Sequence, residues 1–325
     1  MTSHSILVLG HALEKGETGR ALLAGLEAMG RIRVIADTPR EAGPLREALR
    51  EQEILVLDAV PYVCISRDLL EGSSLRLITV TTSGFDHVDV KGARELEIPV
   101  SRVPSYANQA VAEQAIGLLL ALFRKICAAD RLVRSGGFDY RPFLGAEIAG
   151  KTFGIVGLGG IGSRVARLAQ AFGARVLACD IRPRRMSGVE MVPLQRLLEE
   201  SDILSLHADL NPTSLGLIGR EQLGWMKPAA VLVNTGRGRL VDESALFDAL
   251  RDGKIAGAAL DVLAVEKPGT ENPLFALANV VFSPHVGFCT RESLVRRNEI
   301  ILQNIEGYLK GSPVHRVEEE LVACS

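Results

Sequence analysis

The segment VVFSPHVGF, residues 280–288, ends an apolar run with a single histidine, His285, which is followed by Val286 and Gly287. Imidazole exchanges a proton near neutral pH, so this side chain could act as a general acid–base. A lone histidine in a loop is more often a solvated surface residue. The segment alone therefore favours the ordinary interpretation, and the rest of the chain must decide between the two.

A glycine-rich segment could bind the pyrophosphate of a dinucleotide. Residues 154–173, GIVGLGGIGSRVARLAQAFG, contain Gly157-x-Gly159-x-x-Gly162 between an apolar run and an amphipathic helical pattern. Gly157 permits a tight turn, Gly159 lets the backbone approach the pyrophosphate, and Gly162 allows close packing of helix on strand. The N–H groups of Gly160 and Ile161 would face the anion at the start of the helix. A glycine-rich turn without a ligand is the alternative.

An acidic residue follows the next apolar run. Asp180 lies 18 residues after Gly162, where a carboxylate can accept hydrogen bonds from both ribose hydroxyls of a dinucleotide. Its charge would repel a 2′-phosphate, so NAD is favoured over NADP. Arg182, Arg184 and Arg185 lie nearby and leave NADP as the less favoured cofactor.

Two series of short apolar runs alternate with helical patterns, which is typical of parallel sheets with crossover helices. The first series lies at residues 6–9, 32–35, 54–57, 77–80 and 98–101. The second lies at residues 153–157, 175–180, 203–206, 231–234, 258–262 and 279–283. Helical patterns include residues 20–29, 44–52, 108–135 and 291–309.

These elements predict an α/β fold with two doubly wound parallel-sheet domains. We expect a nucleotide-binding Rossmann domain at residues 104–289, inserted into a flavodoxin-like substrate domain formed by residues 1–103 and 290–325.

Composition excludes several other classes. The chain has 325 residues, 47% hydrophobic and 23% charged, with a net charge of −2, so no nucleic-acid or anionic-membrane partner is expected. The five cysteines are scattered and show no metal-ligand spacing, which favours a reduced, cytoplasmic setting. Residues 1–10 show no secretory signal, and the apolar stretch at 115–123 is too short to cross a bilayer.

The chain resembles the D-isomer-specific 2-hydroxyacid dehydrogenase family over nearly its whole length. The segments that carry this resemblance are VPSYANQAVAEQAIGLLLALFRK, GKTFGIVGLGGIGSRVA, VNTGRGRLVDE, GAALDVLAVEKP and SPHVG. The resemblance implies an active site in the cleft between the two domains. It also implies a homodimer built largely from the nucleotide-binding domains.

The resemblance gives three residues catalytic roles. In NTGRG, Arg237 matches the arginine that binds the substrate, and a guanidinium suits a carboxylate beside a carbonyl because it can bond to both. In DVLAVEKP, Glu266 matches the acidic partner of the histidine, and in SPHVG, His285 matches the general acid–base. Without these partners, Glu266 would be read as a solvated loop residue.

Further site residues follow from the same resemblance. Asp261 would accept a hydrogen bond from the nicotinamide carboxamide, with a structural cap as the alternative. Ser83 and Gly84 would help hold the substrate carboxylate, and Tyr106 would line the substrate pocket or, equally, lie in the core. The remaining expected cofactor contacts are Ala208, Ser214, Thr235, Gly236 and Gly287, and His207 is a candidate to line the cofactor cleft.

This sequence departs from the family pattern at three positions near the adenosine end of the cofactor. Gly160 stands where many members carry arginine or lysine, Asp209 replaces a common proline, and Ser214 stands where threonine is frequent. These differences leave the catalytic trio unchanged.

The expected function is NAD-dependent interconversion of a small 2-oxo acid and its D-2-hydroxy acid, without a metal. A non-catalytic NAD(H)-sensing regulator of the corepressor type is the first alternative. Formate dehydrogenase is the second, and Glu266 argues against it because those relatives pair the histidine with glutamine. The sequence does not identify the acid; glyoxylate and hydroxypyruvate are slightly favoured, and 3-phosphohydroxypyruvate stays open.

Overall fold

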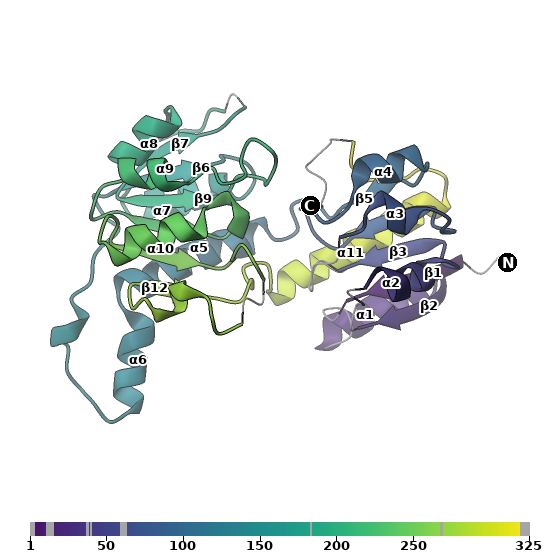
Figure 1. Cartoon of the computed structure of the whole chain (residues 1–325), viewed down its shortest axis with the longest axis horizontal. Helices are drawn as coiled ribbons and strands as arrows, with labels where there is room; N and C mark the ends of the chain where they lie inside the picture. The colour runs from purple at the N-terminus through teal and green to yellow at the C-terminus, as the bar shows by residue number, and fades with distance from the viewer. Residues whose placement is uncertain are drawn as a thin grey trace. The chain divides into compact units, whose positions relative to one another are not determined.

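The protein is described here from a computed structural model, which covers residues 4–10, 16–36, 39, 41–58, 64–182, 184–266 and 269–318. The chain divides into two compact units. Unit 1 comprises Met1–Ala107 and Thr290–Ser325, and unit 2 comprises Asn108–Cys289. Figure 1 shows the sheet and helices of each unit.

Unit 1 contains a five-stranded parallel sheet in the order β2-β1-β3-β4-β5. This is the flavodoxin-like order, as the sequence predicted. The strands are β1 (His4–Leu9), β2 (Gly30–Ile35), β3 (Ile54–Leu57), β4 (Leu77–Val80) and β5 (Val100–Ser101). The helices are α1 (Gly16–Glu27), α2 (Ala42–Leu49), α3 (Arg67–Leu70), α4 (Val90–Glu95) and α11 (Arg291–Leu309).

Unit 2 contains a seven-stranded parallel sheet in the order β12-β11-β10-β9-β6-β7-β8. The strands are β6 (Thr152–Val156), β7 (Arg175–Cys179), β8 (Val189–Met191), β9 (Ile203–Leu206), β10 (Val231–Asn234), β11 (Gly257–Leu260) and β12 (Val280–Phe282). The order reverses between β6 and β9, and a Rossmann fold binds its ligand at this switch point. The predicted class of two doubly wound parallel-sheet domains is therefore confirmed.

Helices cover both faces of the sheet in unit 2. One core lies under α8 (Leu194–Glu200), α9 (Arg220–Trp225) and α10 (Glu243–Arg251) and includes Leu204, Leu206 and Leu232. The other lies under α5 (Asn108–Phe123) and α7 (Gly162–Ala171) and includes Ile203 and Val233. Because side chains alternate along a strand, this division fixes the face on which each strand-end residue lies.

The single long helix expected at residues 108–135 is wrong. The chain instead forms α5, which ends at Phe123, and α6 (Ile126–Arg134), separated by Lys125 in the left-handed region at φ +52°. The carbonyl of Phe123 accepts a hydrogen bond from Ala146 N at 3.1 Å, so the last turn of α5 is closed by a distant residue. Helix α6 has no buried residue and extends away from the sheet of unit 2 (Figure 1).

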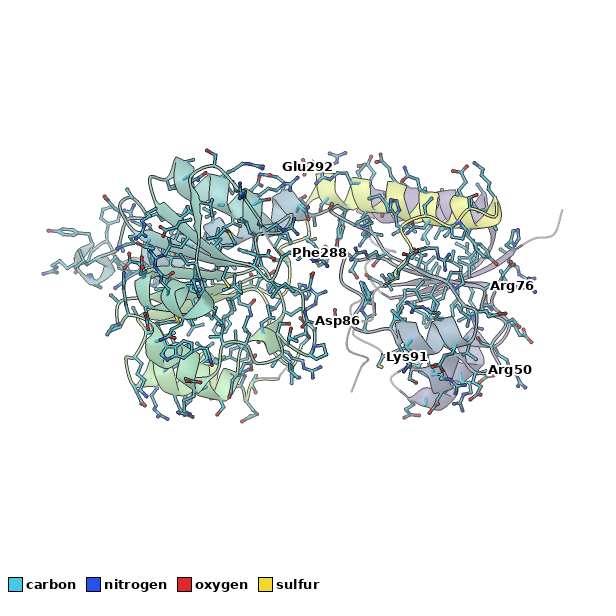
Figure 2. The ribbon with its side chains drawn as sticks, turned by 90° about the horizontal axis from the view of Figure 1, so that it is seen from above. Arg50, Arg76, Asp86, Lys91, Phe288 and Glu292 are labelled. Carbon is cyan, nitrogen blue, oxygen red and sulfur yellow. The ribbon has the colours of Figure 1, made fainter. Side chains whose placement is uncertain are left out.

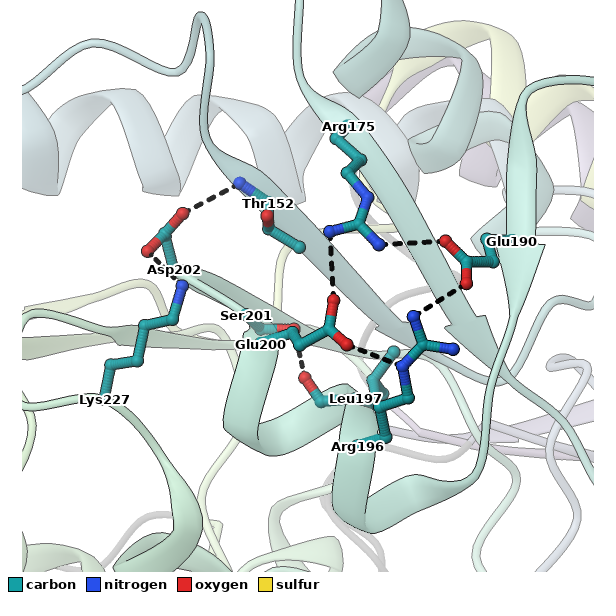
Figure 3. Close-up of polar contacts among 9 residues, drawn as sticks. All are labelled: Thr152, Arg175, Glu190, Arg196, Leu197, Glu200, Ser201, Asp202 and Lys227. Carbon is teal, nitrogen blue, oxygen red and sulfur yellow. Dashed lines mark hydrogen bonds and ion pairs between the residues drawn. The ribbon is translucent and has the colours of Figure 1, made fainter.

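The edge strand β8 is a second difference, since the sequence pattern did not predict it. Four charged side chains connect β8 to β7 and α8 (Figure 3). Arg175 bonds to Glu190 and Glu200, both at 2.9 Å, and Arg196 bonds to the same two carboxylates. The bond from Arg175 lowers the pKa of Glu190, and the bond from Arg196 lowers the pKa of Glu200. The network fixes the edge of the sheet at a solvent-exposed site, where each such pair adds little stability.

Helix α11 begins where unit 2 ends. Thr290 caps it by accepting a hydrogen bond from Ser293 N at 3.2 Å. Glu292, labelled in Figure 2, lies in the first turn, where a carboxylate is stabilised by the helix dipole. The chain is therefore returned to unit 1 by a well-defined helix start.

The cysteines and the apolar helices bear on the expected setting. Among the described cysteines, Cys127, Cys179 and Cys289 are free, whereas Cys64 is disulfide-bonded, so the expectation of reduced cysteines holds for three of these four. In the described part of the chain, the helices are all too short or too polar to cross a membrane.

Candidate active site

The three residues expected to act in catalysis follow neighbouring strands. Arg237 comes three residues after β10, Glu266 six residues after β11 and His285 three residues after β12. These strands are adjacent and parallel. Their carboxyl ends therefore meet at one edge of the sheet, spaced about 5 Å per strand. Ligands of doubly wound folds bind at this edge.

The side chains of His285 and Glu266 are paired. Nδ1 of His285 lies 2.9 Å from Oε1 of Glu266, and the two side chains are 17% and 26% exposed. The His285 ring also packs edge-on against Phe288, with ring centroids 5.9 Å apart. The carboxylate fixes Nδ1, so proton exchange with a substrate would take place at Nε2.

Arg237 lies in a loop that is held by Asn234, the last residue of β10. The buried Asn234 amide accepts a hydrogen bond from Gly236 N at 3.1 Å and donates one to Arg237 O at 2.9 Å. A Cβ atom on Gly238 would lie 2.0 Å from the backbone of Leu263, so only glycine fits there. The half-buried guanidinium donates from Nη1 to Gly236 O at 3.1 Å. The NTGRG sequence thus encodes a rigid loop with an arginine in it.

The loop that carries Glu266 is held by Glu243, at the start of α10. Glu243 Oε1 accepts a hydrogen bond from Ala264 N at 2.5 Å, and its Oε2 accepts one from Asn272 Nδ2 at 3.3 Å. Local spacing could not predict these contacts, because Ala264 and Asn272 lie 21 and 29 positions after Glu243 in the sequence.

Asp261 holds the loop that carries His285. Its carboxylate is 3% exposed and accepts hydrogen bonds from Ser283 Oγ, Val286 N and Gly287 N. Of the two roles considered for Asp261, the structure shows a structural one, and a contact with the nicotinamide stays a prediction. Gly287 is required beside it, since a Cβ atom would lie 2.8 Å from Asp261 Oδ2.

The glycine-rich loop has the shape that a dinucleotide requires. Gly157 has φ +88°, and a Cβ atom on it would lie 2.7 Å from His207 O. A Cβ atom on Gly162 would lie 2.0 Å from Gly157 O, so helix α7 begins in close contact with the turn. A Cβ atom on Gly159, by contrast, would have no heavy atom of the described residues within 4 Å apart from its chain neighbours. The open position is the one through which a pyrophosphate approaches the backbone.

Asp180 lies directly after β7, as the NAD interpretation requires. Its side chain is 9% exposed, and it accepts hydrogen bonds from Leu158 N at 2.7 Å and Arg182 N at 2.8 Å. Arg184 Nε lies 3.9 Å from Asp180 Oδ2. Gly160 and Ile161 lie between the loop and α7, and a Cβ atom on Gly160 would lie 2.4 Å from Asn108 Nδ2. The larger residues of other family members would therefore need a different arrangement at this position.

Two buried polar atoms near the switch point indicate a polar ligand. Within the described residues, His207 Nδ1 and Thr235 Oγ1 are buried and have no hydrogen-bond partner. They follow β9 and β10 directly, on the face that carries Ile203 and Val233. Burial lowers the pKa of His207 to about 3, so its ring is neutral, and Nε2 contacts Ser205 Oγ at 2.8 Å. Unsatisfied buried groups are rare in proteins, and polar atoms of a bound dinucleotide would satisfy these two.

The remaining expected cofactor residues lie close to this edge or in the loop after β9. The Ala208 backbone follows β9 and would lie 2.8 Å from a Cβ atom on Gly157. Ser214 is buried, and its hydroxyl donates to Asp209 O at 2.6 Å and accepts from Asn211 N at 2.8 Å. The structure thus gives the Ser214 hydroxyl a role within the turn, and its contact with a cofactor stays a prediction.

The expected substrate residues other than Arg237 lie in unit 1. Ser83 Oγ donates to Val103 O at 2.7 Å, and Gly84 O accepts from Thr82 Oγ1 at 2.6 Å, so the loop after β4 is well fixed. Tyr106 is 5% exposed, and its carbonyl accepts a hydrogen bond from Arg296 Nε at 2.9 Å. These residues are described within unit 1, and the catalytic trio and the glycine-rich loop within unit 2.

Known proteins are similar to this chain over most of its length. Residues 116–287 match the family described as D-isomer specific 2-hydroxyacid dehydrogenase, NAD binding domain. The chain is 39% identical over 297 residues to a glyoxylate reductase of Korarchaeum cryptofilum, and the aligned region covers 87% of this chain and 89% of the relative. It is 38% identical over 292 residues to a glycerate dehydrogenase of Methylorubrum extorquens, and the aligned region covers 86% of this chain and 89% of the relative.

A solved structure, the acyclic imino acid reductase Bsp5 in complex with NADPH and D-Arg, matches with a TM-score of 0.88 and 33% identity. The match covers 96% of this chain and 99% of that chain. The glycine-rich loop, the paired His285 and Glu266 and these similarities lead to one conclusion. The chain belongs to the D-isomer-specific 2-hydroxyacid dehydrogenase family.

Proposed function

We propose that this enzyme reduces a small 2-oxo acid to its D-2-hydroxy acid with NADH, and catalyses the reverse reaction with NAD. The observation that carries the proposal is the 2.9 Å contact between His285 and Glu266 at the edge of the sheet where Arg237 also lies. A bare nucleotide sensor needs the glycine-rich loop but not this pair.

The chemistry follows from the three side chains. The Arg237 guanidinium binds the carboxylate and polarises the carbonyl of the 2-oxo acid through parallel hydrogen bonds. A nicotinamide cofactor held by the glycine-rich loop and Asp180 would supply the hydride to the carbonyl carbon. His285 donates the proton that the developing alkoxide requires, and the carboxylate of Glu266 stabilises the imidazolium and orients the ring. In the reverse direction, neutral His285 accepts the hydroxyl proton.

The cofactor preference rests on Asp180. Its carboxylate lies where the adenosine ribose is held in Rossmann folds, and its charge opposes a 2′-phosphate. The nearby Arg184 reduces this repulsion, so we propose a preference for NADH over NADPH rather than complete exclusion of NADPH.

The preferred substrate is a small one, glyoxylate or hydroxypyruvate. The relatives reported above are named glyoxylate reductase and glycerate dehydrogenase. Both names refer to short 2-oxo or 2-hydroxy acids, which one arginine fork can bind.

A substrate panel tests the function. Purified protein is mixed with NADH, or with NADPH in a parallel series, and with glyoxylate, hydroxypyruvate, 3-phosphohydroxypyruvate, pyruvate or bulkier 2-oxo acids. We expect loss of NADH absorbance with at least one short acid, and a higher kcat/KM with NADH than with NADPH. Tight NADH binding without turnover of any acid would instead support the sensing regulator.

We also propose that the enzyme is a homodimer formed through α6 and the segment after it. Large apolar side chains project into solvent from this arm, residues 126–144: Ile126 is 52% exposed, Val133 53%, Phe138 96%, Tyr140 87% and Leu144 85%. Several large exposed apolar side chains on one segment are typical of a protein interface. The family resemblance implies a homodimer built largely from the nucleotide-binding domains, so a second copy of this chain is the proposed partner.

The oligomeric state is measured by size-exclusion chromatography with light scattering. The native chain should elute with the mass of a dimer, and the double variant Phe138→Ser/Leu144→Ser should shift toward the monomer. The control is Val295→Ser, which removes a 43%-exposed apolar side chain from α11 in unit 1. A native monomer would contradict the proposal.

A further inference from the structure

The backbone of His285 has a conformation that this residue adopts rarely. Its φ is +52°, in the left-handed region, where a Cβ atom crowds the following carbonyl. A non-glycine residue remains there only if the surrounding structure holds it. The side chain expected to exchange the proton therefore depends on whatever holds its backbone.

Asp261 provides most of that support. Its carbonyl accepts a hydrogen bond from His285 N at 2.7 Å. Its carboxylate accepts two more, from Val286 N to Oδ1 at 3.0 Å and from Gly287 N to Oδ2 at 2.8 Å. Three successive N–H groups are thus bound by one buried residue, which directly follows the neighbouring strand β11. A rotation of the carboxylate would release two of them.

The orientation of that carboxylate is fixed from the other side. Ser283 Oγ is hydrogen-bonded to Asp261 Oδ1, and Gln114 Nε2 is hydrogen-bonded to Ser283 Oγ at 3.0 Å. An ionised carboxylate only accepts, so the Ser283 hydroxyl donates to it, and the Ser283 oxygen is left to accept from Gln114. The directions of both bonds follow from this one requirement.

We propose that Gln114, Ser283 and Asp261 form a positioning relay that holds the His285 backbone from helix α5. The relay rests on the proposed function, because its purpose is to place the imidazole for proton transfer. Gln114 and Ser283 are positioning residues: each acts on His285 through Asp261. A charge-assisted bond to a buried carboxylate is among the stronger hydrogen bonds in proteins, so the Ser283 bond has most of the effect.

The relay is tested in the full-length protein with Ser283→Ala, Gln114→Leu and the double variant. The first measurement is hydrogen–deuterium exchange of the Val286 and Gly287 amides, which requires neither cofactor nor substrate. We expect exchange at these amides to accelerate about tenfold in Ser283→Ala, because local opening becomes easier. The control is Gln109→Leu, which removes an exposed glutamine from the same helix; its side chain donates to Glu113 Oε1 at 2.7 Å.

The second measurement is steady-state turnover with the best acid of the substrate panel. Ser283→Ala should lower kcat about tenfold and Gln114→Leu about threefold, with the melting temperature close to the native value. Because the residues act in series, the double variant should lose no more than Ser283→Ala alone.

The two proposals fail in different ways. If the native protein turns over no acid, the proposed function fails, and amide exchange still tests the relay. Unchanged exchange at Val286 and Gly287 in Ser283→Ala overturns the relay whatever the turnover. Losses in kcat that multiply in the double variant, or that accompany a lower melting temperature, also overturn it, since they indicate independent effects or general destabilisation.

Discussion

Replacing Arg237 with alanine is expected to lower kcat/KM for the 2-oxo acid by at least about 10³-fold, because it removes the donor that faces the developing charge on the substrate. The two hydrogen bonds of the Asn234 side chain and the glycine at position 238 fix the loop independently of the arginine side chain. The variant should therefore fold normally and lose only the guanidinium. Arg237→Lys should recover a small part of the activity, since an ammonium supplies charge without the paired geometry.

The loss must be separated from an effect on the cofactor. NADH binding, followed by its fluorescence, should stay within about threefold of the native value in Arg237→Ala, because the glycine-rich loop and Asp180 are unchanged. Arg239→Ala is the matched control, since it removes an exposed arginine two positions along the same loop. If Arg237→Ala kept more than about a tenth of the native kcat/KM, the assigned role would be wrong.

The fold could be predicted where a strand is a buried apolar run. Ile203–Leu206 and Val231–Asn234 lie in the centre of the sheet, are covered on both faces and read as continuous β-branched or leucine-rich stretches. The edge strand Val189–Met191 is only partly buried and three residues long, so it leaves no such pattern. The division between α5 and α6 was missed for another reason. The apolar spacing continues to Ile126, whereas the contact that ends α5 comes from Ala146.

The site divides in the same way. The positions of the glycine-rich loop and Asp180 follow from local spacing, because turn, helix start and strand end are fixed by neighbouring residues. The roles of Arg237, Glu266 and His285 came from resemblance, and no spacing rule could have paired Glu266 with His285. Nor could it have shown that Asp261 and Glu243 each hold a catalytic loop through residues more than 20 positions away. Such contacts exist only once the strands have been brought together.

Replacing His285 with alanine should lower kcat by about 10²- to 10⁴-fold, the range expected for loss of a general acid. The KM for the acid should change less, because Arg237 still binds the carboxylate. His315→Ala is the matched control: it removes a histidine that also has a left-handed backbone, at φ +50°, but lies in unit 1. Added imidazole should restore part of the activity of His285→Ala, as a free acid that can enter the space left by the ring.

Glu266 offers the sharper test of the mechanism, because the proposed mechanism has it contact His285 and not the substrate. Glu266→Gln keeps a hydrogen bond to Nδ1 and removes the charge, so kcat should fall by about 10- to 100-fold, less than in His285→Ala. In the double variant Glu266→Gln/His285→Ala, as in His285→Ala, no imidazole ring is left on which residue 266 could act. Its activity should therefore equal that of His285→Ala, whereas rescue by imidazole should be weaker without the carboxylate, because the added ring then lacks the group that stabilises its charged form. A double variant far less active than His285→Ala would show that Glu266 acts on the substrate directly.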